Sequence, residues 1–316
     1  MLLNFALIFI GIALLVWSAD RFTDGASALA RNLGVSPLIV GLTIVAIGSS
    51  APEIFVSVTA SLSDSSNLAV GNAIGSNIAN IALVLGVTAM IVPLQIESNV
   101  LRREFPVMFL VTFLAGFILF DGYLSFLDGV VLISSMFIYL FWIVRTAIKS
   151  HQNDRMLEEL VGELPDDMSN QRASLWLVVG LILLPLSSQI LVNGATGIAV
   201  HFGVSEFVIG LTIVALGTSL PELAASVASV LKGEHELAIG NVIGSNIFNL
   251  LVVLGIAGVI TPVTIEADSL VKDYSLMVFL TVVMFFMAYG FKGPGRISRI
   301  EGVVLTTIYA VFLFSQ

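Results

Sequence analysis

The sequence predicts an all-α membrane protein in which ten transmembrane helices form two inverted repeats of five helices each. Three observations lead to this fold class. The chain contains the same motif-rich segment twice, at 36–97 and at 205–266. Long apolar runs recur along its whole length. Its Lys and Arg residues gather in alternate connecting loops, as they do in multi-pass membrane proteins.

The internal repeat is the strongest of these observations. The two copies align without a gap, at the constant offset that separates Ser36 from Ser205, which we call the repeat offset. Each copy carries an acidic motif, GSSAPE in the first and GTSLPE in the second, followed downstream by GSNI. The match extends outside the copies, because Gly25 corresponds to Gly194 at the same offset. A repeat of this length decides the architecture before any single motif is considered.

The composition is that of a membrane protein. Hydrophobic residues make up 57% of the chain and charged residues 11%, against roughly 25% charged residues in soluble domains. Runs of about 18 or more apolar residues can cross a hydrocarbon core of about 30 Å. These runs are continuously apolar rather than alternating, so we expect helices and no sheet. The first run lacks the flanks of a signal peptide and is expected to remain uncleaved. The ten expected spans are 2–19, 37–62, 68–92, 105–120, 124–146, 174–194, 206–231, 237–261, 273–290 and 298–315.

The positions of the basic residues predict the topology. With ten spans, alternate loops lie on opposite sides of the membrane, and 12 of the 13 Lys and Arg residues fall on one side. Only Lys272 falls on the other side. Basic loops stay in the cytoplasm, so both termini are expected to face outward. Five spans per half is an odd number, so the second half enters the membrane from the opposite side and the repeats are inverted. The twelve basic residues are Arg21, Arg31, Arg102, Arg103, Arg145, Lys149, Arg155, Arg172, Lys232, Lys292, Arg296 and Arg299.

The chain divides into two halves and a connection. We expect a first five-helix repeat at 1–148, a cytoplasmic linker at 149–172 and a second five-helix repeat at 173–316. The linker is polar and acidic, and it has no EF-hand pattern. We interpret it as a solvated connection rather than as a regulatory calcium site. The absence of Cys excludes disulfides and thiolate metal sites.

The acidic motifs place a carboxylate at a predicted helix break. Pro52 removes a backbone N–H and clashes with the preceding turn, and Pro221 does the same in the second half. Carbonyl groups freed by such a break need a partner inside the membrane, and a desolvated cation can be that partner. Glu53 and Glu222 add negative charge, and hydroxyl groups precede each of them. Carboxylates, hydroxyls and carbonyls form an all-oxygen site, which suits hard cations such as calcium and sodium.

The span after each acidic motif contributes hydroxyl and amide groups. Ser76 and Asn80 are four residues apart and share one helical face, as do Ser245 and Asn249. Glycines in a G-x-x-x-G pattern let these spans approach their neighbours closely. No Lys or Arg falls within the four motif-bearing spans, so an ionised glutamate there needs another cationic partner. Two more side chains in these spans either bind ions or only hold helices together, namely Asn72 and Asn241.

These residues make the chain resemble a known family. GSSAPE and GTSLPE, each followed by a G-S-N-I-x-N element in an inverted five-plus-five layout, are similar to the two alpha repeats of the calcium/cation antiporter superfamily. The resemblance is closest to its bacterial sodium/calcium exchanger branch of inner-membrane calcium/sodium antiporters, and it covers essentially the whole chain. It implies alternating access by a sliding bundle of the first and sixth helices, the sixth being interrupted around Pro185.

The resemblance also implies which residues bind the transported ions. In that family, four motif-bearing helices surround one calcium site and several overlapping sodium sites. Glu53 and Glu222 match the central carboxylates, and the carbonyls of Ala46 and Ala215 match outer sodium positions. The matching hydroxyl and amide ligands are Ser49, Thr218, Ser50, Ser219, Ser76, Ser245, Asn80 and Asn249.

Two departures from the family pattern affect this site. Ser49 and Ala51 replace the usual Thr and Leu of the first motif, a change that keeps the hydroxyl. Asn249 replaces an Asp of the best-characterised pattern, which leaves two carboxylates and a formal charge of −2. One Ca²⁺ or two Na⁺ would neutralise that charge, whereas a third Na⁺ would leave +1 near the midplane at a cost of roughly 2.5 kcal/mol or more. A water in place of the third ion is one solution, and the sequence leaves the stoichiometry of two or three Na⁺ per Ca²⁺ open.

Together the motifs predict an antiporter that exchanges Na⁺ for Ca²⁺ across the lipid bilayer and extrudes cytosolic Ca²⁺. An H⁺/Ca²⁺ or K⁺-dependent exchanger of the same fold is the alternative, although the proton branch typically has Asn where this chain has Ser50 and Ser219. A channel is disfavoured because no pore-loop signature is present. A hydrolase is disfavoured because a serine nucleophile needs a base and the three His residues fall in loops. We expect no enzymatic activity, no cofactor, no nucleic acid partner and no obligate protein partner, so that the chain can act as a monomer.

Overall fold

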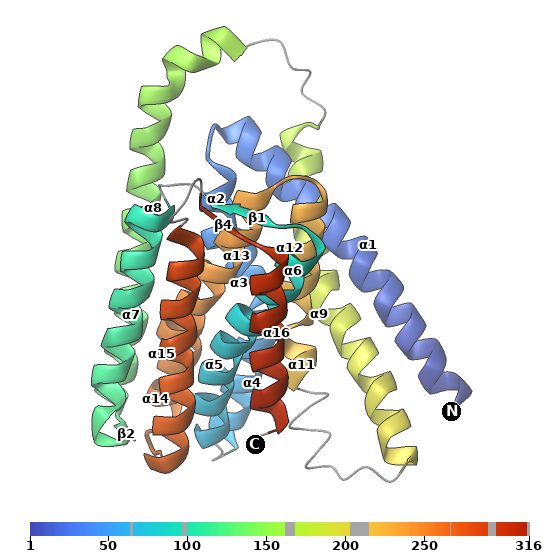
Figure 1. The fold of residues 1–316 in the computed structure, drawn as a ribbon, viewed down its shortest axis with the longest axis vertical. Coiled ribbons are helices and arrows are strands. Elements are labelled where there is room, and N and C mark those ends of the chain that lie inside the picture. The colour runs from blue at the N-terminus through green and yellow to red at the C-terminus, as the bar shows by residue number, and fades with distance from the viewer. Residues whose placement is uncertain are drawn as a thin grey trace.

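The apolar runs of the sequence form long helices that lie side by side (Figure 1). The computed structural model describes residues 1–63, 66–96, 100–161, 168–202, 215–265, 267–289 and 295–314. The first half contains α1 (Leu2–Leu33), α2 (Pro37–Val40), η1 (Gly41–Val45), α3 (Ala46–Ser49), α4 (Ala51–Leu62), α5 (Ser66–Ala79), η2 (Asn80–Leu85), α6 (Gly86–Ile91), β1 (Leu94–Ile96), η3 (Val100–Glu104), α7 (Phe105–Ile118), η4 (Leu119–Asp121), β2 (Tyr123–Leu124) and α8 (Phe126–Val161). The second half contains α9 (Asn170–His201), α11 (Ala215–Thr218), α12 (Leu220–Leu231), α13 (His235–Phe248), η6 (Asn249–Val253), α14 (Leu254–Ile260), β3 (Val263–Thr264), α15 (Ala267–Tyr289), β4 (Gly295–Ile297) and α16 (Arg299–Phe314).

Most of the expected spans are present as helices of membrane length. Seven of these spans are single helices. The bent pair of helices Leu38–Ser49 and Ala51–Leu62 forms an eighth span. The predicted span 206–231 is described only from residue 215 onward, and the predicted span 298–315 is the 16-residue helix α16. Within the described ranges, the seven helices long and apolar enough to cross a membrane are Leu2–Leu33, Ser66–Ile91, Val100–Asp121, Phe126–Arg145, Asn170–Ala195, His235–Ile260 and Leu270–Tyr289.

Three helices extend beyond their expected spans. α1 continues from residue 19 to Leu33, and α8 continues to Val161, through the first part of the expected linker 149–172. That part of the linker is helical because Met, Leu and Glu favour helix. α9 runs unbroken from Asn170 to His201, so the expected interruption around Pro185 is wrong. Proline is tolerated inside transmembrane helices because neighbouring groups can satisfy the backbone carbonyl that it frees.

Two short sheets connect loops of the two halves, so the expectation of no sheet is wrong for the loops, although the spans themselves are helical. β1 pairs antiparallel with β4, and β2 pairs antiparallel with β3. β1 begins at Leu94 and β3 at Val263, two positions related by the repeat offset, so the strands are counterparts. Figure 1 places β1 and β4 toward one end of the bundle and β2 at the other. The same contact is therefore made twice, once at each end, as inverted repeats require.

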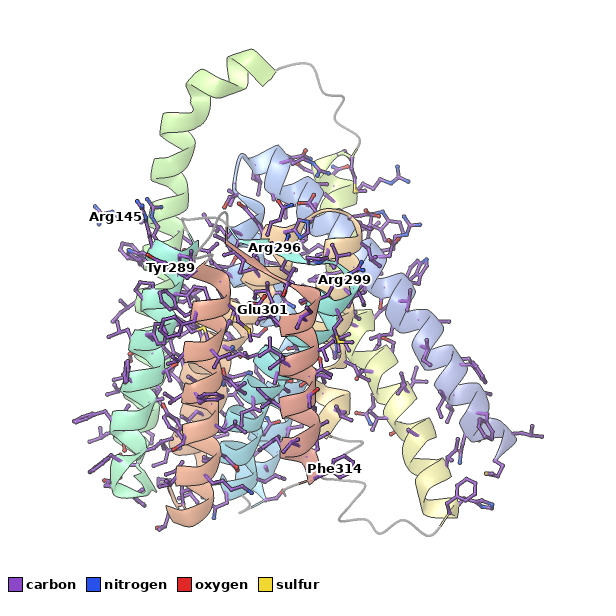
Figure 2. All side chains as sticks on the ribbon, viewed as in Figure 1. Arg145, Tyr289, Arg296, Arg299, Glu301 and Phe314 are labelled. Carbon is purple, nitrogen blue, oxygen red and sulfur yellow. The ribbon has the colours of Figure 1, made fainter. Side chains whose placement is uncertain are left out.

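The two chain ends lie at one end of the bundle, opposite the C-terminal part of α8 and the start of α9 (Figure 1). Arg145, Arg296 and Arg299 lie toward the end with α8's C-terminus, and Phe314 lies at the end with the chain termini (Figure 2). This arrangement agrees with the predicted separation of the basic residues from the chain termini. The assignment of the basic end to the cytoplasm stays a prediction from the charge distribution.

α1 and α9, the first helices of the two halves, pack tightly against each other. A Cβ atom built on Gly11 would lie 2.7 Å from the backbone nitrogen of Leu191, so only glycine fits there. The rings of Trp17 and Trp176 meet edge to face with centroids 5.9 Å apart. We refer to this pair of helices as the α1–α9 unit. Four of its interfacial glycines form two pairs related by the repeat offset, Gly11 with Gly180 and Gly25 with Gly194.

The remaining motif-bearing helices form the centre of the molecule. α2 and η1 of the first half pack against α13 of the second half. A Cβ on Gly41 would lie 2.6 Å from the carbonyl oxygen of Leu237, and a Cβ on Gly240 would lie 2.6 Å from that of Leu38. Because both contacts involve backbone atoms, the two repeats touch at van der Waals distance without side chains between them.

We expect Gly240→Ala to lower the thermal stability of the protein. The added methyl group would overlap the Leu38 carbonyl oxygen, and α2 would have to move away from α13. Overpacking of this kind costs about 1–3 kcal/mol, so the Tm of the purified protein in detergent should fall by several degrees. Gly71→Ala is the matched control, because Gly71 is the repeat counterpart and a Cβ there meets no atom of the described residues within 4 Å. Equal Tm values for the two variants would contradict this account of the packing.

Candidate ion-binding site

Both acidic motifs interrupt their helices at the predicted positions. Ser50 lies between α3 and α4 with φ −81° and ψ 10°, and Ser219 lies between α11 and α12 with φ −88° and ψ 0°. The helix axis bends by 44° at the first of these breaks. The proline of each motif occupies the first turn of the next helix, where a missing N–H is tolerated. Glu53 and Glu222 also lie in that first turn, where the helix dipole favours negative charge.

The two carboxylates are buried where the halves meet. Glu53 and Glu222 are each only 1% exposed. The Ser50 hydroxyl donates to Glu222 Oε1 at 3.1 Å, so a motif residue of one half contacts the carboxylate of the other. The two carboxylates also interact electrostatically with each other. The fold thus brings together two glutamates that lie in opposite halves of the chain.

A second contact between the halves centres on Ser49. Its hydroxyl donates to Asn241 Oδ1 at 3.0 Å and lies 3.4 Å from the hydroxyl of Ser245. All three side chains are buried. Two predicted ligands, Ser49 and Ser245, are therefore adjacent although they belong to different repeats.

Asn72 and Asn241 hold the two glutamate backbones. Asn72 Nδ2 donates to the Glu53 carbonyl oxygen at 3.1 Å, and Asn241 Nδ2 donates to the Glu222 carbonyl oxygen at 3.2 Å. Asn241 Nδ2 also donates to the Ser226 hydroxyl at 3.0 Å. The sequence left open whether these amides bind ions or hold helices together. In the structure they fix the residues that carry the carboxylates, and Asn241 makes more contacts than its counterpart.

Polar atoms without a protein partner mark the rest of the site. A buried polar atom of this kind needs an explanation, above all inside a membrane. Five of the twelve predicted ligand residues have a buried side-chain N or O atom with no hydrogen-bond partner among the described residues. Because most of these atoms are oxygens, a hard cation is a suitable partner for them. They are Glu53 Oε2, Glu222 Oε2, Ser219 Oγ and both amide atoms of Asn80 and Asn249.

π-helical turns begin at the two amide ligands. Asn80 is the first residue of η2, and Asn249 is the first residue of η6. A third π-helical segment, η1, ends directly before Ala46. Such turns interrupt the regular α-helical hydrogen bonding and recur at functional sites. Local sequence patterns do not predict these turns, and the only signal near two of them is the repeated G-S-N-I-x-N element.

The other predicted ligands lie on the same helices. Ser76 is buried on α5, one turn before η2 begins. Ala46 is the first residue of α3, and its carbonyl oxygen accepts a backbone N–H from the break residue at 3.1 Å. A carbonyl oxygen has a second lone pair, which a cation can use. Ala215 and Thr218 begin and end α11, so they directly precede the break of the second half.

The site has no basic side chain to neutralise it. Among the residues that the structure describes, the ion pairs of Arg21, Arg31 and Lys232 all lie elsewhere, and none of them reaches Glu53 or Glu222. Two buried carboxylates surrounded by hydroxyl, amide and carbonyl oxygens can hold cations with a total charge near +2.

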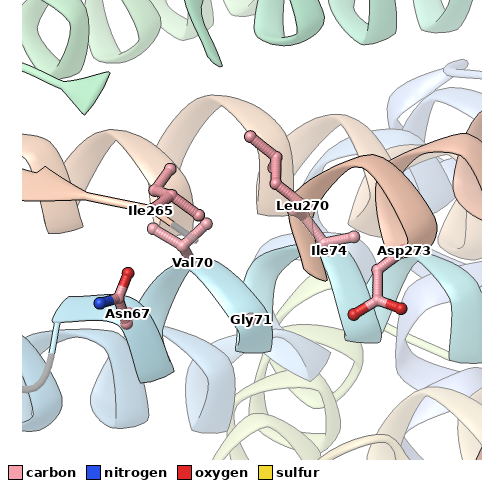
Figure 3. Close-up of a pocket in the computed structure, with 7 residues that line it drawn as sticks. All are labelled: Asn67, Val70, Gly71, Ile74, Ile265, Leu270 and Asp273. Carbon is pink, nitrogen blue, oxygen red and sulfur yellow. The ribbon is translucent and has the colours of Figure 1, made fainter. Parts of the chain in front are cut away.

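A cavity of about 260 Å³ lies near this site but is separate from it. It lies between α5 and the start of α15, with Asn67 and Asp273 as its polar lining (Figure 3). The α5 residues that line it occupy the helical face opposite Asn72 and Ser76. The cavity therefore does not contain the predicted ligands.

Comparisons with known proteins agree with this geometry. The family model described as sodium/calcium exchanger protein matches residues 3–145 and 172–316, one match for each half. The putative antiporter CaxA of Alkalimonas amylolytica is 47% identical, with 100% of each chain covered. The inner membrane protein YrbG of Escherichia coli (strain K12) is 44% identical, with 99% of this chain and 96% of YrbG covered.

A solved structure shares the fold. The sodium-calcium exchanger NCX_Mj, soaked with 2.5 mM Na⁺ and 1 mM Sr²⁺, matches with a TM-score of 0.85 and 32% sequence identity. The match covers 100% of this chain and 99% of that chain. The predicted fold class, with ten helices in two inverted five-helix repeats, is confirmed by this match and by the two-part family match.

We expect Asn241→Ala to weaken Ca²⁺ binding more than Asn72→Ala does. Asn241 positions the Glu222 backbone and contacts Ser49 across the interface, whereas Asn72 makes one contact to the Glu53 backbone. Loss of a contact that orients a metal ligand typically lowers affinity by about 10- to 100-fold. Isothermal titration of the purified protein with Ca²⁺ in Na⁺-free buffer measures the difference, with the Tm of each variant as a control for folding. An unchanged affinity in Asn241→Ala would contradict the positioning role.

Proposed function

The chain belongs to the sodium/calcium exchanger protein family and has the fold of a multi-pass cation antiporter, and on that premise we propose that it exchanges Na⁺ for Ca²⁺ by alternating access. The observation that carries the proposal is the pair of carboxylates, Glu53 and Glu222, which are buried at the contact between the halves and have no basic partner among the described residues. Two negative charges at this depth require cations. The oxygen-rich surroundings suit Ca²⁺ and Na⁺ in particular.

Exchange follows from competition for one set of oxygens. Ca²⁺ and Na⁺ bind the same two carboxylates, so the site holds one load or the other. An empty site would carry uncompensated charge past the apolar barrier, which is unfavourable. Only the loaded states then switch between the inward-facing and outward-facing conformations. Transport of one ion species in one direction therefore requires transport of the other in the opposite direction. The residues proposed to bind the ions are Glu53, Glu222, Ser49, Thr218, Ser50, Ser219, Ser76, Ser245, Asn80, Asn249, and the carbonyls of Ala46 and Ala215.

The physiological direction is extrusion of cytosolic Ca²⁺, driven by the inward Na⁺ gradient. The proposed location is the inner membrane, in line with the name of the relative YrbG. In this arrangement both termini face outward, and the 149–172 segment lies in the cytoplasm. The antiporter acts without an obligate protein partner, because the two halves of one chain supply both carboxylates.

The charge of the site favours two Na⁺ per Ca²⁺. Asn249 leaves Glu53 and Glu222 as the carboxylates of the site, so one Ca²⁺ or two Na⁺ gives a neutral load. A third Na⁺ would leave +1 near the midplane, at roughly 2.5 kcal/mol or more. Exchange of two Na⁺ for one Ca²⁺ moves no net charge, so the membrane potential should neither help nor oppose it.

Glu53→Gln and Glu222→Gln should each abolish Ca²⁺ transport while leaving the fold intact. Each substitution keeps the shape of the side chain but leaves the site with one negative charge, too little for a Ca²⁺ load. Glu104→Gln is the matched control, because Glu104 is a buried glutamate in a spanning segment outside the proposed site. ⁴⁵Ca²⁺ uptake into proteoliposomes measures transport, and size-exclusion chromatography checks folding. A fully active Gln variant at either site position would refute the assignment.

Ca²⁺ uptake into proteoliposomes should require internal Na⁺ and should be independent of the membrane potential. Vesicles loaded with Na⁺, with K⁺ or with a proton gradient identify the coupling ion, and potentials clamped at two values report the charge moved. One net charge would change the equilibrium Ca²⁺ accumulation ratio roughly 50-fold per 100 mV, and no net charge would leave it unchanged. Asn249→Asp adds a third carboxylate and should introduce voltage dependence. Uptake driven by protons alone would reject Na⁺ as the coupling ion.

A further inference from the structure

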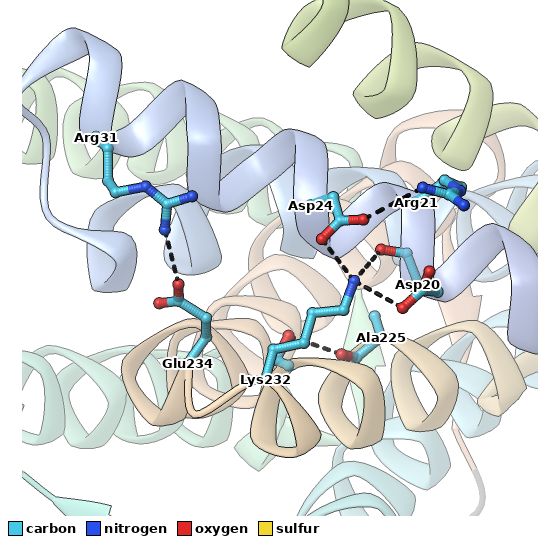
Figure 4. A network of polar contacts seen from close by, with 8 residues as sticks. Asp20, Arg21, Asp24, Arg31, Ala225, Lys232 and Glu234 are labelled. Atoms are coloured by element: carbon cyan, nitrogen blue, oxygen red, sulfur yellow. Dashed lines mark hydrogen bonds and ion pairs between the residues drawn. The ribbon is translucent and has the colours of Figure 1, made fainter. Parts of the chain in front are cut away.

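A network of charged side chains connects α1 with the connection between α12 and α13 (Figure 4). Lys232 Nζ lies 2.7 Å from Asp20 Oδ1 and 2.7 Å from Asp24 Oδ1. Arg31 Nη1 lies 3.2 Å from Glu234 Oε1. By the distribution of basic residues, this network lies on the cytoplasmic face. It lies outside the proposed ion site, and nothing in the exchange chemistry requires it.

The sliding bundle of the first and sixth helices that the family resemblance implies would make the α1–α9 unit one moving body, and the network joins this body to the remaining helices. Arg21 contacts two residues of the α1–α9 unit: its Nη1 lies 3.6 Å from Asp24 Oδ2 on α1, and its guanidinium lies 5.3 Å from the centre of the Trp176 ring on α9. Lys232, in contrast, follows the last residue of α12, the helix that carries Glu222 in its first turn. The Lys232 ion pairs therefore tie the α1–α9 unit to a helix of the ion site. Any sliding of α1 past the end of α12 has to break them.

Because the two halves are repeats, the residues of this network can be compared with their counterparts in the other half. At the repeat offset, the counterparts of Asp20, Asp24 and Lys232 are Gln189, Asn193 and Ser63. None of these counterparts carries a formal charge, so they cannot form the same ion pairs on the opposite face. Gln189 Nε2 instead donates to Asn193 Oδ1 at 2.9 Å, within α9 itself. The helices are duplicated, but the charged contact between them is not.

We infer that the Lys232 ion pairs with Asp20 and Asp24 act as a latch on the cytoplasmic gate, which makes the outward-facing state the resting state of the antiporter. If both gates had the same contacts, inverted repeats would give the inward- and outward-facing states similar free energies. A contact that exists on one face lowers the free energy of the state in which that face is closed. The inference rests on the alternating access proposed above, but not on the identity of the ions.

The latch is weak enough to open in every transport cycle. The side chains of Lys232, Asp20 and Asp24 are 26%, 47% and 32% exposed, so water screens each pair. Lys232 Nζ also donates to the Asp20 carbonyl oxygen at 2.7 Å, so one amine makes three contacts to α1. Exposed ion pairs contribute little individually, and we expect the three contacts together to shift the population of the two states by about threefold to tenfold.

Cysteine labelling tests the latch directly, because the chain contains no Cys of its own. Ser229→Cys is the reporter for the cytoplasmic gate, since Ser229 is buried on α12 one turn before Lys232. Ala60→Cys, the repeat counterpart on α4, is the reporter for the outer gate. In purified protein in nanodiscs, Lys232→Ser should raise the maleimide labelling rate of the Ser229→Cys reporter about threefold to tenfold. The same change should lower the rate of the Ala60→Cys reporter.

Matched variants separate the latch from a general loss of stability. Arg299→Gln removes a basic charge toward the same end of the molecule but outside the network, since Arg299 Nη2 donates to the Ile91 carbonyl oxygen, and it should leave both labelling rates unchanged. Lys232→Glu combined with Asp24→Lys reverses one ion pair. This double variant should restore much of the original ratio between the labelling rates of the Ser229→Cys and Ala60→Cys reporters. Placing the charges on the outer face, with Ser63→Lys and Asn193→Asp, should shift the ratio in the opposite direction to Lys232→Ser.

Two outcomes would overturn the latch. One is an unchanged ratio of labelling rates in Lys232→Ser, and the other is a parallel rise at both reporters, which would indicate loosening of the whole fold. Labelling needs no transported ion, so it can succeed or fail independently of the flux assay. A normal latch response together with absent Na⁺/Ca²⁺ exchange would reject the proposed coupling ions and keep the latch.

Discussion

Two buried negative charges without a positive side chain form the constraint on which the rest of this structure depends. Glu53 and Glu222 lie where the two halves meet, and the motif-bearing spans around them contain no Lys or Arg. An uncompensated carboxylate inside a membrane is too unfavourable to persist, so the surroundings have to accommodate a cation. In the site that we propose, the helix breaks, the hydroxyl groups of the motifs and the amide groups at the start of the π-helical turns would all provide oxygen atoms for that purpose.

The duplication explains how one chain builds this site. Positions at which the two repeats carry different residues explain how the two faces differ. Asn72 and Asn241 make the same bond to the backbones of the two glutamates, so the repeat preserves the positioning of the carboxylates. Among the residues that the structure describes, the charged contact around Lys232 occurs on one face only. Duplication thus supplies a site that can be reached from both sides, and substitutions outside the motifs set the balance between the sides.

The site and the cytoplasmic network share a single helix, α12. Glu222 lies in its first turn and Lys232 follows its last residue, with Asn241 of α13 bonded to the Glu222 backbone. A rigid helix of this length carries a displacement at one end to the other end. In the proposed mechanism, ion binding at Glu222 and the strength of the contact to α1 are therefore mechanically connected, although about three helical turns separate Glu222 from Lys232.

The sequence by itself determined the span positions, the breaks before Glu53 and Glu222, and the inverted architecture, because these follow from apolar length, proline chemistry and repeat offset. It also indicated the ligand residues, five of which carry unpartnered buried atoms in the structure. Only the tertiary structure decided that α9 continues through Pro185, that Asn241 bonds the Glu222 backbone, and that Lys232 reaches Asp20 and Asp24. Those features depend on which helices become neighbours, and contacts between residues far apart in the chain leave no trace in local sequence patterns.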